Sequence, residues 1–199
     1  MTRGPDKQFD TTVALEQAMR VFWARGFAAA GLTELLEAMN IGRKSMYDTF
    51  GNKRELFLKC LEHYSDTVVR GITEVLSGAG PPLDNVQCSL EYIEERNGQR
   101  VSNGCLLGVS MAQFRSDDPQ IANLLCEHLQ VLEDSYYRQF RRAREMGQLS
   151  GRQNPRDLAR CFTATVQGLT LIRRVNEAPA MSRGIIRGAR TMLAALKSA

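Results

Sequence analysis

The sequence predicts an all-α protein built from an N-terminal three-helix unit and a larger C-terminal helical domain. Three observations predict this fold class. Apolar residues recur at helical spacing through most of the 199 residues. Proline and glycine interrupt that pattern at a few points only, such as the run at 77–82. Residues 31–53 have the pattern of two short helices joined by a tight turn. We expect about nine helices in total.

Composition and charge limit the possible functions. Hydrophobic residues make up 43% and charged residues 24% of the chain, as in ordinary globular proteins. The net charge of +4 is compatible with a polyanionic partner but too small to demonstrate one. Because no apolar run approaches the ~20 residues that span a bilayer, and residues 1–10 lack a signal-peptide core, we expect a cytoplasmic protein without membrane contact. The five cysteines are scattered and odd in number, which indicates reduced thiols.

The first helix follows a short basic arm at residues 1–9. Asp10 or Thr11 is suited to cap this helix, and Gly26 to end it. Phe27 then provides an apolar contact for the helix end. The positions expected to face inward repeat at helical spacing: Ala14, Ala18, Val21 and Phe22.

The next two predicted helices form a helix-turn-helix. Leu32, Leu35, Leu36 and Met39 supply the buried face of its first helix. Asn40 occupies the turn, where a left-handed backbone is needed. In the second helix only Met46 is expected to face inward. Its outward side chains are hydrogen-bond donors suited to phosphates and base edges, namely Arg43, Lys44, Ser45 and Tyr47. The pattern therefore predicts a DNA-binding domain over residues 1–52. A helical scaffold without affinity for DNA is the alternative.

Residues 53–199 are expected to form the second domain. Asn52 is predicted to cap a long helix from Lys53 to about Leu76 that provides a rigid connection to the DNA unit. Further helices are predicted at about 83–95, 105–114, 119–146 and 155–174. A last helix is expected to begin after a cap at Ser182.

In order and spacing, these residues resemble the DNA-binding signature of the tetracycline-repressor family of bacterial transcriptional regulators. The resemblance is close over about the first third of the chain and extends only to helix number and length beyond it. The matching positions are Ala18-x-x-x-Phe22-x-x-x-Gly26-Phe27, Leu32-Thr33-Glu34-Leu35-Leu36 and Ser45-Met46-Tyr47-x-x-Phe50-x-x-Lys53-x-x-Leu56. The resemblance implies a dimeric, ligand-responsive regulator, most simply a repressor released from a palindromic operator, and no enzyme activity or cofactor.

The same resemblance implies which residues meet the operator. Thr33 and Lys53 would bind phosphate at the starts of their helices, where a helix N-terminus favours an anion. The remaining contacts would come from the recognition helix: Arg43, Lys44, Ser45, Tyr47 and Thr49. The chain departs from the family in having Asn40 in place of the usual glycine and Thr49 in place of the common His or Tyr. Asp48 would repel phosphate unless it accepts from a cytosine amino group or pairs with a neighbouring cation.

Family members of this kind pair their last two helices in a dimer. Small residues that recur four positions apart allow a partner helix to approach closely. The chain carries two such pairs in its last two predicted helices, Ala164 with Gly168 and Gly184 with Gly188. Alternatively, Gly168 provides room for a neighbour within the chain or for a ligand.

The other helices are expected to enclose a small-molecule effector site. Cys105 follows Asn-Gly as in a branch of the family, some of whose members sense electrophiles or oxidants through a cysteine at this place. A helix N-terminus favours a thiolate, which suits such a role, whereas a buried apolar cysteine is the alternative. Further candidates for polar groups of the site are Tyr64, Tyr92, His128 and Gln167.

The cysteines leave two alternative functions. Cys60 and His63 lie three residues apart on a helix and could contribute to a metal-responsive regulator, but two ligands do not make a site, so we expect no metal. A cysteine-dependent enzyme using Cys105 would need a general base, and neither of the histidines, His63 and His128, lies in a recognisable catalytic setting.

Overall fold

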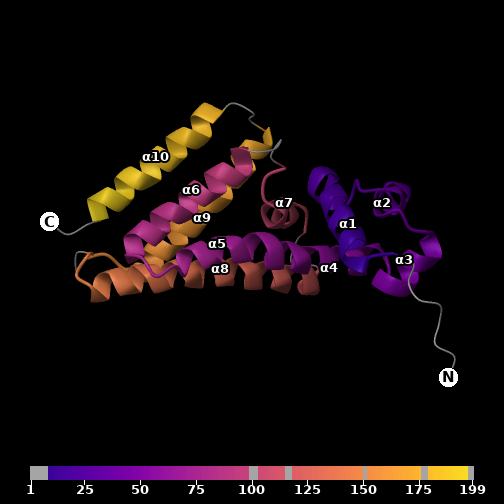
Figure 1. Ribbon diagram of the computed structural model, residues 1–199, viewed down its shortest axis with the longest axis horizontal. Helices are drawn as coiled ribbons and strands as arrows, with labels where there is room; N and C mark the ends of the chain where they lie inside the picture. Colours follow the sequence, from indigo (N-terminus) through magenta and orange to yellow (C-terminus); the bar gives the residue numbers. More distant parts are fainter. Residues whose placement is uncertain (1–8, 99–102, 115–117, 150–151, 176–178, 197–199) are drawn as a thin grey trace, which may run out of the picture. The chain divides into compact units, whose positions relative to one another are not determined.

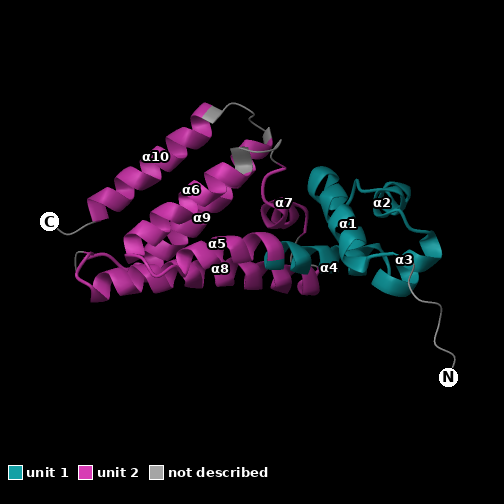
Figure 2. Cartoon of the chain, in the orientation of Figure 1, with its two compact units in different colours: residues 1–66 teal, residues 67–199 magenta. Residues whose placement is uncertain are grey.

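The computed structural model describes residues 9–98, 103–114, 118–149, 152–175 and 179–196 (Figure 1). The predicted basic arm therefore lies, apart from Phe9, outside the described residues. The chain divides into two compact units, residues 1–66 and 67–199 (Figure 2). The fold is all-α, with nine helices among the described residues when the segments of the long fourth helix are counted together. The first unit extends beyond residue 52, and the assignment of separate functions to 1–52 and 53–199 stays a prediction.

Helix α1 (Thr11–Arg25) begins and ends where its caps predict. The Asp10 carboxylate accepts hydrogen bonds from the Thr12 and Val13 N–H groups at 2.8 and 3.1 Å. At the other end Gly26 has φ +80°, and its N–H donates to the Phe22 carbonyl. The buried arc is centred between Ala18 and Phe22, so that Met19 is buried while Val21, at the edge of the arc, is half-buried.

Helices α2 (Leu32–Met39), α3 (Arg43–Phe50) and α4 (Lys53–Tyr64) complete the first unit. Aromatic rings join α1 to α4: the Phe22 and Phe57 centroids lie 5.0 Å apart, and Trp23 meets Tyr64 edge-to-face at 5.1 Å. Such pairs add stability beyond the burial of their area. Side chains that are almost completely buried line the centre of this unit: Ala18, Phe22, Leu35, Met46, Leu56, Phe57 and Leu61.

The predicted long helix is helical over its whole length but not uniformly α-helical. After α4 the backbone forms a π-helical turn at Ser65–Val69 and then continues as α5 (Arg70–Leu76). The division between the two units falls within this turn. A π-helical turn inserted in an α-helix widens one turn and is often found at functional sites. Apolar periodicity predicted the helix but not this interruption.

The second unit contains α5, α6 (Pro82–Gly98), α7 (Leu106–Gln113), α8 (Pro119–Glu145), α9 (Pro155–Val175) and α10 (Pro179–Leu196). Helix α8 packs against α9, α6 packs against α8, and α10 packs against α9 and α6 (Figure 1). The prediction that Ser182 caps the last helix is wrong. The helix begins at Pro179, a residue favoured in the first turn, and Ser182 is buried inside it.

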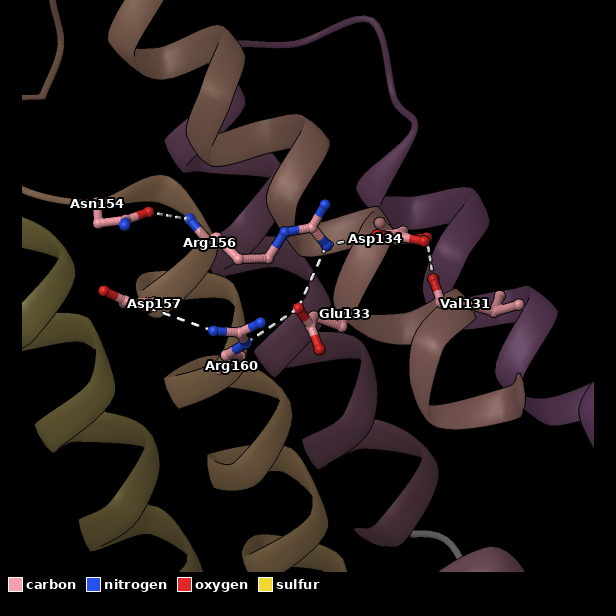
Figure 3. A network of polar contacts seen from close by, with 8 residues as sticks. Val131, Glu133, Asp134, Asn154, Arg156, Asp157 and Arg160 are labelled. Atoms are coloured by element: carbon pink, nitrogen blue, oxygen red, sulfur yellow. Dashed lines mark hydrogen bonds and ion pairs between the residues drawn. The ribbon is translucent and has the colours of Figure 1, made fainter. Parts of the chain in front are cut away.

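Arg156, near the start of α9, holds that helix against α8 (Figure 3). Its Nη1 lies 3.2 Å from the Glu133 Oε1 and also donates to the Asp134 carboxylate. Its guanidinium carbon stands 3.8 Å from the centre of the Tyr137 ring, a cation–π contact. Arg160 adds a second ion pair to Glu133 at 3.3 Å. The hydrogen bond from Arg156 lowers the pKa of Asp134.

Two buried polar contacts fix α6 against its neighbours. The Ser89 and Tyr136 hydroxyl groups lie 2.9 Å apart in the core of the second unit. The Asn85 amide donates to the Gly78 carbonyl at 2.8 Å and so closes the turn that follows α5. Among the described residues, no helix is long and apolar enough to cross a lipid bilayer.

Candidate nucleic-acid interface and effector region

The turn between α2 and α3 has the geometry that the sequence predicts. Asn40 adopts the left-handed conformation, with φ 52° and ψ 45°. The Asn40 N–H donates to the Glu37 carbonyl at 3.1 Å, and the Ile41 N–H donates to the Leu36 carbonyl at 3.2 Å. This pair of bonds is the Schellman pattern that ends a helix. It sets the angle at which the chain enters α3.

Helix α3 has one buried and one exposed face. Met46 and Phe50 are 0 and 4% exposed and fix the helix to its unit. Ser45 and Thr49 are half-buried at the edges of this contact. The exposed face carries Arg43, Lys44, Tyr47 and Asp48. Tyr47 keeps 46% of its surface in solvent, which is unusual for a large aromatic side chain without a partner surface.

The polar side chains of this face can bind nucleic acid in two ways. Arg43 and Lys44 carry cations suited to phosphates or guanine edges, and the Tyr47 hydroxyl is suited to the phosphate backbone. Among the described residues no ion pair joins Asp48 to Arg43 or Lys44, so both cations are available to a partner. Thr33 is exposed in the first turn of α2.

The start of α4 is held by a capping box. The Asn52 side chain accepts from the Arg54 and Glu55 N–H groups at 2.9 and 3.0 Å, and Glu55 Oε2 accepts from the Asn52 N–H at 2.7 Å. Lys53 is the first residue of the helix, and its ammonium nitrogen lies 4.8 Å from the centre of the Phe27 ring. Sequence reasoning identified each residue separately, but residues 26 positions apart give no local signal of this contact.

Cys105 and Gln167 each lie close to Gly108, in the first turn of α7. Cys105 is the N-cap of α7 and is 6% exposed, and its sulfur accepts from the Gly108 N–H at 3.5 Å. The Gln167 Oε1, on α9, is buried without a hydrogen-bond partner among the described residues. A Cβ placed on Gly108 would lie 3.2 Å from that oxygen. The loop before Cys105 is tied to α9, because Arg174 donates to the Asn103 carbonyl at 2.8 Å.

The other three effector candidates lie on other helices of the chain. Tyr92 lies half-buried on α6, where its hydroxyl accepts from Arg96 at 3.1 Å and approaches the backbone of α5 at Gly71. His128 is half-buried on α8. Tyr64 is buried in the first unit beside Trp23.

Cys60 belongs to the core of the first unit. Its thiol is completely buried and donates to the Leu15 carbonyl at 3.8 Å. Burial raises the pKa of the Cys60 thiol far above its ordinary value, which keeps it protonated and disfavours metal binding. No group of three or more potential metal ligands is found in the described part of the chain.

The small residues predicted for the dimer lie on α9 and α10. A Cβ added to Gly168 or Gly188 would meet nothing within 4 Å, so a contact within the described chain does not explain either glycine. Large apolar side chains are exposed on the same two helices: Leu171 is 38%, Met181 52% and Met192 53% exposed. Ala164 is exposed and Gly184 half-buried. We call this set of residues on α9 and α10 the α9–α10 face.

Comparison with known proteins agrees with this architecture. Residues 14–60 match the profile of bacterial regulatory proteins of the tetR family, and residues 86–189 match that of the tetracyclin repressor-like C-terminal domain. The chain is 29% identical to the HTH-type transcriptional regulator YezE of Bacillus subtilis, over 86% of this chain and 90% of that protein. It is 25% identical to the HTH-type transcriptional repressor BdcR of Escherichia coli, over 67% of each chain.

A solved structure extends this likeness to a DNA complex. A cysteine-substituted form of the TetR-family regulator CifR, bound to 26-bp double-stranded operator DNA, is 26% identical to this chain and superposes with a TM-score of 0.83. The match covers 97% of this chain and all of that one. Together with the C-terminal profile, which alone spans more than half of the sequence, these matches show that the chain belongs to the TetR family of DNA-binding transcriptional regulators, which are not enzymes.

Proposed function

We propose that this chain acts as a homodimeric repressor that binds a palindromic operator and is released by an effector at the second unit. The observation that carries the proposal is the exposed face of α3, where Arg43, Lys44 and Tyr47 surround a buried anchor at Met46. A helix of this kind enters the major groove with its N-terminal residues at the base edges. Around it, phosphate contacts are assigned to Thr33, Ser45, Thr49 and Lys53.

Binding to the promoter of its own gene tests the DNA face. We expect a Lys44→Ala, Tyr47→Ala double variant to lose at least about 30-fold in affinity, since contacts of this kind contribute ~1–3 kcal/mol each. Lys59→Ala is the matched control, because Lys59 is an exposed lysine on α4 and is not assigned to DNA. Undiminished binding by the double variant would reject the assigned face. A reporter gene then distinguishes repression from activation.

The dimer is supported by the α9–α10 face. Glycine inside a helix costs about 1 kcal/mol relative to alanine, and Gly168 and Gly188 have no neighbour within the described chain that requires it. A partner helix that packs against them would explain both the glycines and the exposed Leu171, Met181 and Met192. A dimer places two recognition helices about 34 Å apart, one turn of DNA. A footprint with two protected half-sites at that spacing is the expected result.

The effector region is assigned to Cys105 and Gln167. Cys105 caps α7 with a buried sulfur that accepts from the Gly108 N–H, so a group added to this sulfur would disturb the start of α7. Gln167 offers an acceptor oxygen without a partner among the described residues. A small-molecule ligand that binds without covalent change is the alternative, and Tyr92 and His128 are then the further polar groups of the second unit to test.

Thiol sensing is tested in a background that lacks the exposed cysteines. Cys88, Cys126 and Cys161 are exposed and would react first, so they are replaced by serine. In this background an electrophile such as N-ethylmaleimide should release the protein from the operator DNA. A further Cys105→Ser change should abolish that release. Release that persists without Cys105, or operator binding that survives the reagent in both proteins, removes Cys105 as the sensor.

A further inference from the structure

Lys53 occupies a position that is electrostatically unfavourable for a cation. It is the first residue of α4, where the helix dipole is positive and the first N–H groups point outward. No ion pair with a carboxylate stabilises it among the described residues. An anion bound at this place would be stabilised both by the ammonium and by the helix start.

The Phe27 ring is the group that Lys53 contacts. The ammonium nitrogen lies 4.8 Å from the ring centre, within the range at which the ring's negative face attracts a cation. The ring itself is held on two sides. It stacks on Phe22 at 6.1 Å with an angle of 17° between the planes, and it lies 5.0 Å from Phe57. Both neighbours are almost completely buried.

The backbone before Phe27 directs the ring to this place. Gly26 has φ +80°, a conformation that residues with a side chain rarely adopt, and its N–H is bonded to the Phe22 carbonyl at 2.8 Å. The chain therefore turns back at the end of α1, so that Phe27 faces the start of α4. A lysine side chain has many rotamers in solution, and a fixed ring face restricts them.

We propose that Phe27 is a positioning residue for operator binding: its ring face holds the Lys53 ammonium at the start of α4, ready to bind a DNA phosphate. This inference rests on the proposed role of Lys53 and adds a residue that itself touches no DNA. Preorganisation of this kind raises affinity because less side-chain freedom is lost on binding. The Gly26-Phe27 turn thus serves DNA binding as well as the folding of the first unit.

A double-mutant cycle on the full-length protein tests the proposal. Operator affinity and its dependence on salt are measured for the wild type, Phe27→Leu, Lys53→Met and the double variant. We expect Lys53→Met to reduce the slope of log K against log[salt] by about one unit per protomer. Phe27→Leu should lower affinity by about threefold or more in the wild-type background and have no further effect when combined with Lys53→Met. Phe27→Tyr, which keeps an aromatic ring face, should bind the operator with the affinity of the wild type.

The outcomes distinguish the proposed contact of Lys53 with phosphate from the proposed positioning role of Phe27. If Lys53→Met changes neither the affinity nor the slope, the proposed contact of Lys53 with phosphate is wrong. If Lys53→Met weakens binding while Phe27→Leu lowers affinity equally in both backgrounds, Phe27 acts only on the fold and the positioning role is overturned. Should Phe27→Leu fail to fold, the wild-type NMR spectrum decides: the Lys53 ε-CH2 protons must show an upfield ring-current shift, and shifts typical of a free lysine would overturn the proposal.

Discussion

Gly51 lies at a place that no other residue can occupy without moving its neighbour. Its φ is +81°, and a Cβ there would collide with the Glu55 carboxylate that closes the capping box of α4. The backbone conformation requires glycine, and a side chain there would in addition displace the Glu55 carboxylate from the capping box. The junction of α3 and α4, which positions Lys53, thus depends on this residue.

Replacing Gly51 by alanine should therefore destabilise the first unit. We expect Gly51→Ala to lower the free energy of unfolding by about 1–3 kcal/mol, because it strains the backbone and displaces the Glu55 side chain. Denaturant titration followed by circular dichroism measures the change. Gly31→Ala is the control: Gly31, the N-cap of α2, has φ −71° and open space around its Cα, so this change should remove only the preference of an N-cap for glycine over alanine, below about 1 kcal/mol. Equal effects of the two substitutions would contradict this account.

The buried thiol of Cys60 should make stability fall at alkaline pH. Burial raises its pKa, so the folded state keeps a proton that the unfolded state loses above about pH 8.5. Stability is therefore complete below that pH and decreases as the pH rises, by at most about 1.4 kcal/mol per pH unit from this group. Burial likewise raises the pKa of Tyr136 to about 12, which adds a further decrease only above pH 10.

A comparison of wild type with Cys60→Ala between pH 8 and 10, under reducing conditions, isolates the Cys60 contribution. The variant should be less stable at pH 7, since a buried side chain is truncated, but its stability should fall less steeply with pH. The same slope in both proteins would show that the thiol is not the group responsible.

At the scale of elements, α8 and α9 depend on the geometry of Arg156. The guanidinium contacts two carboxylates and a ring face at once, which the point charge of a lysine cannot reproduce. We expect Arg156→Lys to lower the denaturation midpoint measurably, whereas Arg141→Lys, which alters an exposed pair with Glu145, should have almost no effect. High salt should reduce the difference in stability between the wild type and Arg156→Lys. A stability difference unaffected by salt would argue against an electrostatic origin.

Individual elements also show how far the sequence predicted the structure. The caps at Asp10 and Asn52 and the turn at Asn40 were predictable, because local hydrogen bonding decides them. The start of α10 was not, since Pro179 and Ser182 both suit a helix N-terminus and only packing selects one. The exposed face of α3 followed from periodicity. The contact of Lys53 with Phe27 and the burial of Cys105 arise from tertiary structure, for which one sequence gives no local signal.

For the whole molecule, the proposed dimer predicts that adding bulk to the α9–α10 face separates the protomers. Gly168→Trp should keep its fold, since the space around Gly168 is open within the described chain, but a tryptophan would prevent close approach of a partner helix. Light scattering after size-exclusion chromatography should show a monomer, and operator affinity should fall by at least about 100-fold, because the two recognition helices are no longer linked. Arg141→Trp, at an exposed position of α8, is the control and should leave the mass unchanged. A Gly168→Trp protein that stays dimeric would remove this face as the interface.

The π-helical turn at Ser65–Val69 also predicts where this chain tolerates the loss of a residue. Each π-type bond spans one residue more than an α-type bond, so this turn stores one surplus residue between two regular segments. Removing a single residue here would let the backbone close into an ordinary helix while α4 and α5 keep their own buried faces, whereas the same deletion inside α4 would turn every following apolar side chain of that helix away from its contacts. A scan of one-residue deletions from 53 to 76 should therefore find its most tolerant sites within this single turn.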